Sequence, residues 1–107
     1  MPKYLVQNSY TPEGMAGLIA EGGSSRRDAA EALVESLGGT VESFYYATGE
    51  SDVVLVVDLP DNASLVTAVA TVAASGAMGG AKTTLLITPE EVDQAANKTA
   101  AYRPPGQ

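Results

Sequence analysis

The chain has 107 residues, which suits one domain with one hydrophobic core. Its thirteen acidic and six basic residues give a net charge of −7, which repels phosphate backbones, so we expect no nucleic-acid partner. It has no cysteine and no histidine, which excludes disulfides, thiolate nucleophiles, imidazole bases and ordinary zinc sites. We therefore predict no metal and no cofactor.

The distribution of apolar residues also argues against a membrane segment. The longest uninterrupted apolar run is Val53–Val57, far short of the ~20 residues that a membrane span needs. The first residues enter a strand pattern at once, without the basic and apolar regions of a signal peptide. We therefore expect no membrane partner and a cytoplasmic location.

The amino-terminal segment predicts a strand followed by a short helix. Residues Lys3–Tyr10 have high β-propensity at alternating positions. Thr11 and Pro12 then form a helix start, with the threonine as N-cap and the proline at the first helical position. Because Gly22-Gly23 interrupts the helical pattern, we expect this helix to end near Ala20.

A second helical segment and a second strand come next. Ser25 and Asp28 have the spacing of a capping box, so we expect this segment to begin at Ser24 or Ser25. Gly38-Gly39 ends it as a C-cap. The strand predicted over Thr40–Thr48 carries three adjacent aromatic residues, Phe44, Tyr45 and Tyr46.

The third strand is the strongest indication of the fold. Its apolar run does not alternate, which is typical of a strand that is buried on both faces. One face would take the helices, and a second copy of the chain would have to cover the other. We therefore predict that the run contributes to a subunit interface through Val53, Val54, Leu55, Val56 and Val57.

The remaining elements repeat the strand–helix–strand order. A helix is predicted from Asp61 to about Ser75. Its residues expected against the sheet are Leu65, Val66, Val69 and Val72. A strand over Lys82–Ile87 follows, and Thr88-Pro89-Glu90-Glu91 has the cap, proline and acid of a final short helix.

This element order predicts the ferredoxin-like βαββαβ sandwich, an α+β fold with an antiparallel four-stranded sheet. Both helices would cover one face, so the other face predicts a homodimer or higher homo-oligomer. We assign residues 1–98 to the domain and residues 99–107 to an extended tail. Tyr102, followed by Arg-Pro-Pro, is predicted to anchor that tail on its own or a neighbouring subunit, the alternative being disorder.

Several passages closely resemble the GYD-domain family of small bacterial proteins. They include Tyr10–Gly14, Leu37–Tyr45, Leu59–Asn62, Thr88–Glu91 and Tyr102–Pro105. The resemblance implies a ferredoxin-like fold that pairs as a dimeric α/β barrel, and it implies no activity. The motif that names the family, Gly-x-Tyr-Asp, reads Gly49-Glu50-Ser51-Asp52 here, with serine in place of tyrosine.

Two features predict a ligand site. The Gly22–Arg27 loop could hold an anion with backbone N–H groups and Arg26, the simpler interpretation being a serine cap with solvent-facing arginines. Asp52 could be a catalytic proton acceptor at a pocket mouth, or a turn residue that binds local N–H groups. The expected topology gathers Tyr10, Arg26 and Asp52 around one cleft, with Arg26 as anion anchor.

The tyrosines are further ligand-binding candidates, although a structural role at sheet edges is the commoner one for such residues. Tyr45 and Tyr46 are adjacent on a strand and point to opposite faces, so at most one shares a pocket with Tyr10. The candidate ligand-binding set is therefore Tyr10, Arg26, Tyr45, Tyr46 and Asp52.

Three functions are compatible with these features, and whether the protein is an enzyme stays open. The first is a homo-oligomeric domain that binds a small organic or anionic molecule. The second is a cofactor-independent oxygenase or isomerase acting on a small aromatic or enolisable substrate. There Asp52 would take a proton, a tyrosine would stabilise an enolate and Arg26 would anchor the substrate. The third is a ligand-free structural or regulatory oligomer.

Overall fold

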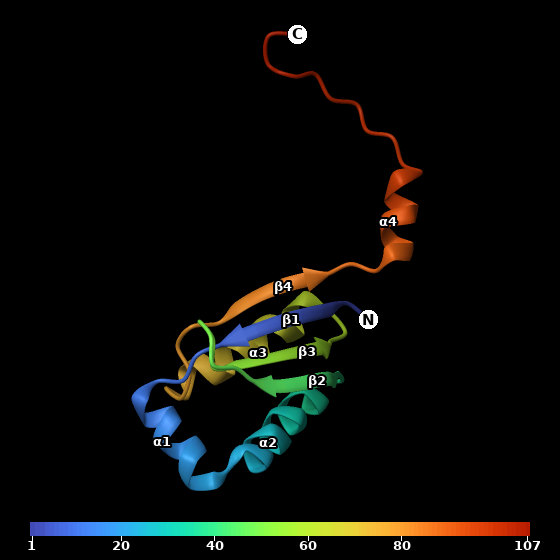
Figure 1. Ribbon diagram of the computed structural model, residues 1–107. Helices are drawn as coiled ribbons and strands as arrows, with labels where there is room; N and C mark the ends of the chain where they lie inside the picture. The colour runs from blue at the N-terminus through green and yellow to red at the C-terminus, as the bar shows by residue number, and fades with distance from the viewer.

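The computed structural model describes all 107 residues and shows a four-stranded sheet, helices packed on it, and a carboxy-terminal extension (Figure 1). The elements in chain order are β1 (Lys3–Asn8), α1 (Pro12–Glu21), α2 (Gly23–Ser36), β2 (Thr40–Tyr46), β3 (Val53–Asp58), α3 (Asn62–Ala74), β4 (Lys82–Leu86) and α4 (Pro89–Ala96). The strand order is β2-β3-β1-β4, and every neighbouring pair is antiparallel. The predicted ferredoxin-like α+β fold is confirmed.

Two helix starts follow their sequence signals. The Thr11 side chain accepts a hydrogen bond from the Gly14 N–H at the start of α1. At α4, Thr88 and Glu91 form the complete capping box that their spacing predicts. Because these caps satisfy N–H groups that have no partner within the helix, both boundaries are fixed by local sequence.

The start of α2 differs from the prediction. The helix begins at Gly23, no side chain caps it, and the expected capping box of Ser25 and Asp28 does not form. Gly22 has a φ of 95°, a conformation that favours glycine, and this single residue turns the chain from α1 into α2. The helix has therefore started before either serine is reached.

Two strands end two residues earlier than predicted. β1 ends at Asn8 instead of Tyr10, and β2 ends at Tyr46 instead of Thr48. The Tyr10 N–H donates to the Asp52 carboxylate at 2.9 Å, so it is not available to a strand ladder. Tyr10 still pairs with Met78 in an isolated antiparallel bridge.

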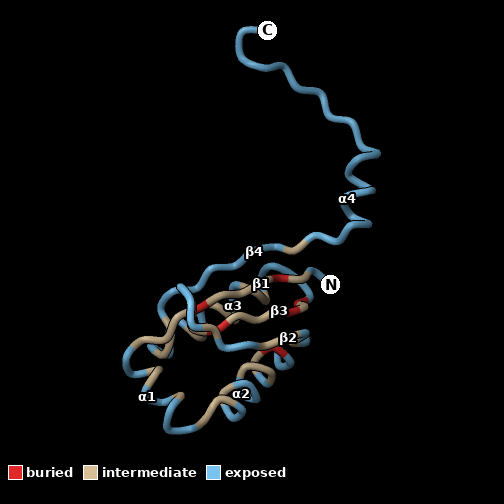
Figure 2. The backbone as a smooth tube through the Cα atoms, viewed as in Figure 1, coloured by how far each residue is buried: buried red, intermediate tan, exposed pale blue.

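The core lies between the sheet and the helices, where Figure 2 shows the buried residues. Tyr4 of β1 is paired with Val57 of β3, and the two form the core with Val34 of α2 and Leu59. None of these four residues is more than 5% exposed. The strands and α2 therefore meet in a small, closed cluster at one end of the sheet.

One residue of α3 was assigned to the wrong side. Leu65, Val69 and Val72 face the space between α3 and the sheet, as predicted, whereas Val66 is 64% exposed. Successive residues of a helix are ~100° apart, and the face centred near Leu65 and Val72 leaves Val66 toward solvent.

The opposite face of the sheet, which we call the outer face, is not covered by the chain itself. Val54 and Val56 alternate with the helix-facing residues of β3 and are partly exposed. The buried residues of the third strand, Val53 and Val57, are therefore all on the helix side. The subunit interface predicted there stays a prediction.

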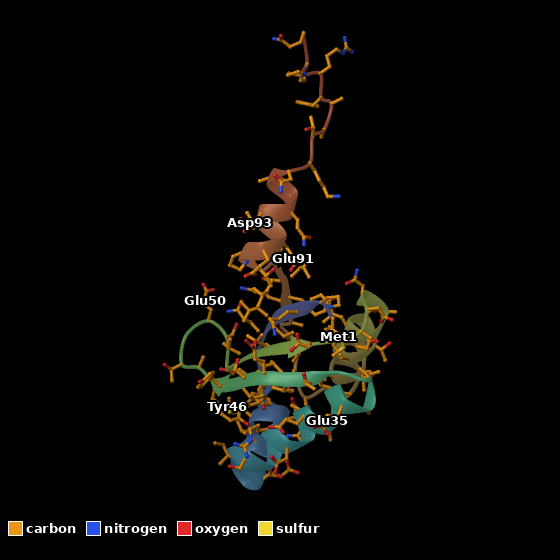
Figure 3. The ribbon with its side chains drawn as sticks, turned by 90° about the vertical axis from the view of Figure 1, so that its right-hand side faces the viewer. Met1, Glu35, Tyr46, Glu50, Glu91 and Asp93 are labelled. Atoms are coloured by element: carbon orange, nitrogen blue, oxygen red, sulfur yellow. The ribbon has the colours of Figure 1, made fainter.

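After β4 the chain leaves the body of the domain, and we call residues 87–107 the C-terminal arm. Every residue of this arm is exposed, including Tyr102 at 79%. Figure 3 shows α4, with Glu91 and Asp93, standing clear of the sheet. The radius of gyration is 17.3 Å, against about 13 Å for a compact domain of this length. Tyr102 therefore does not pack on its own domain, and its contact with a neighbouring subunit stays a prediction.

Candidate functional site

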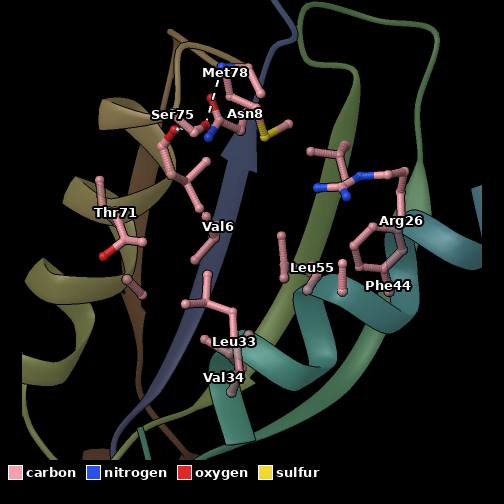
Figure 4. A pocket seen from close by; sticks show the side chains of 18 of the residues that line it. Val6, Asn8, Arg26, Leu33, Val34, Phe44, Leu55, Thr71, Ser75 and Met78 are labelled. Atoms are coloured by element: carbon pink, nitrogen blue, oxygen red, sulfur yellow. Dashed lines mark hydrogen bonds between the residues drawn. The ribbon is translucent and has the colours of Figure 1, made fainter. Parts of the chain in front are cut away.

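A cavity of about 260 Å³ lies between the helix-covered face of the sheet and helices α2 and α3 (Figure 4). Seventeen of its twenty-one lining residues are hydrophobic, so most of its wall can only contact an apolar group. The helices contribute the small side chains of Ala29, Ala30 and Ala68 to this wall. Since larger side chains would fill the layer, these alanines leave the space open.

Three of the polar side chains predicted for the site, Tyr10, Arg26 and Tyr46, lie near one end of the cavity. Asn8, Val53 and Tyr46 form one row across the sheet, at the end where β1 finishes. The Tyr46 hydroxyl donates to the Gly23 carbonyl oxygen at 2.9 Å, which holds the start of α2 over this row. Arg26, one turn into α2, and Tyr10, just after β1, both line the cavity there. The structure therefore brings these two predicted residues together.

The phenol of Tyr10 stays protonated at neutral pH. Burial raises the pKa of this phenol above its ordinary value of 10.0, and the nearby Tyr46 raises it further. The positive charge of Arg26 acts in the opposite direction, and the charge of Asp52 adds a smaller rise. The Tyr10 hydroxyl is therefore a hydrogen-bond donor at this end of the cavity.

Asp52 has a positioning role. Its carboxylate accepts the hydrogen bond from the Tyr10 N–H at 2.9 Å, and its own N–H donates to the Asn8 carbonyl oxygen at 2.9 Å. These bonds fasten the end of β1 to the start of β3. Asp52 does not line the cavity, so its position fits the structural alternative better than the proposed proton acceptor.

The adjacent tyrosines separate as strand geometry requires. Tyr46 packs edge-to-face on Phe44, with ring centroids 5.3 Å apart, on the helix-covered side. Tyr45 is 69% exposed and does not line the cavity. It borders only a shallow surface hollow beside Gly23 and Arg27. Of the two, Tyr46 is therefore the one that lies near Tyr10.

Arg26 is only partly engaged by the protein. One guanidinium nitrogen pairs with the Glu21 carboxylate at 3.2 Å, and both side chains are substantially exposed. Exposed ion pairs of this kind contribute little to stability, so a ligand oxygen can replace or share the contact. Arg27 instead pairs with Asp28 and Glu31 on the surface of α2. Lys82, the first residue of β4, is exposed, and its amine lies 3.8 Å from the Glu50 carboxylate.

A loop before β4, residues 76–80, forms the rim of the cavity beside Tyr10. The Thr11 hydroxyl donates to the Gly76 carbonyl oxygen at 2.8 Å, and the Thr11 N–H donates to that of Ala77 at 3.0 Å. Gly14 allows this approach, because a Cβ there would lie 2.0 Å from the Ala77 oxygen. The rim loop is therefore fastened to the start of α1.

The sequence interpretation missed Asn8, which is 8% exposed and lines the cavity. Its side-chain oxygen accepts hydrogen bonds from the N–H groups of Ser9 and Gly80, at 2.9 and 3.1 Å. A signal was present, because Asn8 continues the inward-facing positions of Tyr4 and Val6 in β1. A polar residue at the third inward position indicates a polar patch on that face.

No group of three or more acidic residues, cysteines or histidines converges in a way that could hold a metal ion. None of the helices combines the length and the hydrophobicity needed to span a bilayer.

The comparisons with known proteins give one positive finding. The family model of the GYD domain matches residues 4–96, which span the sheet and all four helices. Searches of curated proteins and of solved structures returned no match. Ser51, at the tyrosine position of the family motif, is 7% exposed and leads directly into Asp52. With most of its length covered by the family match, the chain belongs to the GYD-domain family.

Proposed function

We propose that this protein is a homo-oligomeric domain that binds a small organic or anionic molecule in the cavity between the sheet and helices α2 and α3. The observation that carries the proposal is the wall of that cavity, which is hydrophobic except for a few polar groups. Sites for small molecules generally combine an apolar enclosure with a small number of placed polar side chains. The apolar part supplies affinity, and the polar end fixes orientation.

Binding is better supported than enzymatic proton transfer. No aspartate or glutamate lines the cavity, and Asp52 is occupied with backbone N–H groups outside it. An oxygenase or isomerase that starts by removing a proton needs a base within hydrogen-bond reach of the substrate. The Tyr10 phenol is protonated and cannot serve as that base at neutral pH. We therefore favour a binding domain over the cofactor-independent enzyme.

The homo-oligomer is proposed from the outer face of the sheet. Leu5, Val54 and Val56 lie on this face without a covering layer from their own chain. A second copy, placed sheet against sheet, would bury these side chains and complete the barrel that membership of the family implies. The exposed C-terminal arm, with Tyr102, would be free to contact that second copy.

The proposal is tested by thermal denaturation with a panel of small carboxylates, amides and alcohols. A compound that binds only the folded chain raises the melting temperature in proportion to its concentration and affinity. The matched control is Ala30→Leu, which fills part of the cavity and should abolish the shift for every compound. If no compound changes the melting temperature of the native chain, the binding proposal fails and a ligand-free oligomer becomes the better explanation.

A further inference from the structure

The side chain of Asn8 is a polar group in an otherwise apolar wall. It is 8% exposed, and Figure 4 shows it at the end of β1 beside Ser75 and Met78. Removing an amide from water without compensating hydrogen bonds is costly, so each of its polar atoms needs a partner or access to solvent. The partners of the two ends of this amide are different.

The oxygen end of the amide is fully used. The Ser9 and Gly80 N–H groups both donate to Oδ1, at 2.9 and 3.1 Å. Turning the amide over would place its NH2 group against two donors, so the orientation is fixed by the backbone. The nitrogen end donates to no group of the chain. Because no fully buried side-chain nitrogen lacks a partner, this NH2 group is not fully buried. Asn8 lines the cavity, so the NH2 group is accessible from there.

The one charged group that lines the cavity, Arg26, is also a donor. The Arg26 guanidinium has only donors and uses one nitrogen for Glu21. The hydroxyls of Thr71 and Ser75 already donate to carbonyl oxygens of their own helix, at 2.7 and 2.6 Å, so toward a ligand their oxygens can only accept. No carboxylate lines the cavity. A ligand group that contacts both Asn8 and Arg26 must therefore accept hydrogen bonds.

We propose that Asn8 and Arg26 together bind the carboxylate of a monocarboxylic acid whose compact apolar body lies along the alanine-lined wall. This inference rests on the proposed function that the cavity binds a small molecule. The Asn8 NH2 group would donate to one carboxylate oxygen and Arg26 to the other. An ammonium group at the same place would meet the Asn8 NH2 group and the positive charge of Arg26 and would be rejected.

The first experiment uses three probes with one apolar body: 4-phenylbutanoate, its primary amide and 4-phenylbutylamine. Isothermal titration calorimetry on the full chain at neutral pH should rank the acid first and the amine last. Loss of a hydrogen bond to a charged group corresponds to about tenfold to a hundredfold in affinity, which is the expected difference between acid and amine. Absence of binding by all three probes would overturn the proposed function and this inference together.

The second experiment changes Asn8 alone. Asn8→Asp keeps an oxygen for the Ser9 and Gly80 N–H groups and replaces the donor by an acceptor. The acid should lose at least about tenfold in affinity, and the amine should gain. Arg26→Gln is the matched comparison and should weaken the acid while leaving the amide nearly unchanged.

The outcomes separate the two proposals. If all three probes bind equally well and Asn8→Asp changes nothing, the cavity binds ligands but Asn8 selects none, and the inference is wrong. If the preference for the acid over the amine is lost in Arg26→Gln but kept in Asn8→Asp, the inference is also wrong. Should Asn8→Asp fail to fold, the side-chain amide resonances of Asn8 in the native chain give the answer. A shift on adding the acid supports the contact, and no shift contradicts it.

Discussion

The two faces of the sheet are made by the same strands and differ in what covers them. In β3, Val53 and Val57 are at most 3% exposed on the helix side, whereas Val54 and Val56 on the outer face are partly exposed. All four residues are valines with the same backbone conformation. Hydrophobicity therefore does not explain the difference in burial. The helix face is covered by helices of the chain itself, and the outer face has no covering layer from the same chain.

The largest expected effect comes from placing a charge on the helix face. Val57→Glu puts a carboxylate into the core cluster with Tyr4 and Leu59, where no cation is near enough to pair with it. A buried unpaired charge costs several kcal/mol, comparable to the whole stability of a small domain. Far-ultraviolet circular dichroism should show an unfolded chain at 25 °C. A folded Val57→Glu protein would mean that this face is less closed than its exposure indicates.

The neighbouring substitution on the outer face should act on assembly. Val56→Glu leaves the core untouched and places its charge where the proposed second copy would pack. We expect native-like circular dichroism and, by multi-angle light scattering, the mass of a single chain. The unsubstituted protein should show a multiple of that mass at micromolar concentration. A native protein that is already monomeric would remove the proposed interface.

Ionisation of the Tyr10 phenol, on the helix side, should lower the stability of the fold by an intermediate amount. The pKa of this phenol is raised above 10.0, so the stabilisation from its protonated form is complete below that pH and is lost as pH rises toward the folded-state value. Absorbance titration near 295 nm should show a late phase, in which a tyrosine ionises above the ordinary value of 10.0. Tyr10→Phe should remove this late phase. A late phase that survives the substitution belongs to another tyrosine.

The smallest effect is expected in the C-terminal arm. Tyr102 is 79% exposed, so Tyr102→Ala should change the stability of a single chain by no more than about 0.5 kcal/mol. If the arm contacts a second copy, the substitution should lower the melting temperature more at high protein concentration than at low. The exposed Val66→Ala is the control, for which no concentration dependence is expected.

The element order and the helix caps could be predicted because they depend on neighbours in sequence. Thr11-Pro12 and Thr88-Pro89 start their helices exactly where local hydrogen bonds place them. The start of α2 could not be placed in this way. The positive φ angle of Gly22 lets the helix begin at Gly23, ahead of both serines. The orientation of Val66 could not be predicted either, because it depends on how α3 is placed on the sheet.

The candidate site was predictable in part for the same reason. The antiparallel topology placed Tyr10 and Asp52 at one edge of the sheet, and the structure joins them by a hydrogen bond of 2.9 Å. Arg26, whose loop the topology did not place, lines the same cavity as Tyr10. The bonds of Asp52 to Tyr10 and Asn8 depend on the turn into β3, which the spacing of residues did not reveal. The role of Asn8 could not be predicted, because its hydrogen-bond partner Gly80 lies far along the chain.

The bond between Gly80 and Asn8 joins residues 72 positions apart, and the bond from Thr11 to Gly76 joins residues 65 apart. Closing such long loops costs chain entropy before any contact repays it, so these contacts are expected late on the folding pathway. The donors of the cavity would then reach their places only after the sheet has assembled. In native-state hydrogen exchange, the Gly80 amide should open before the amides of β1 and β3, since the rim can detach while the strands stay paired.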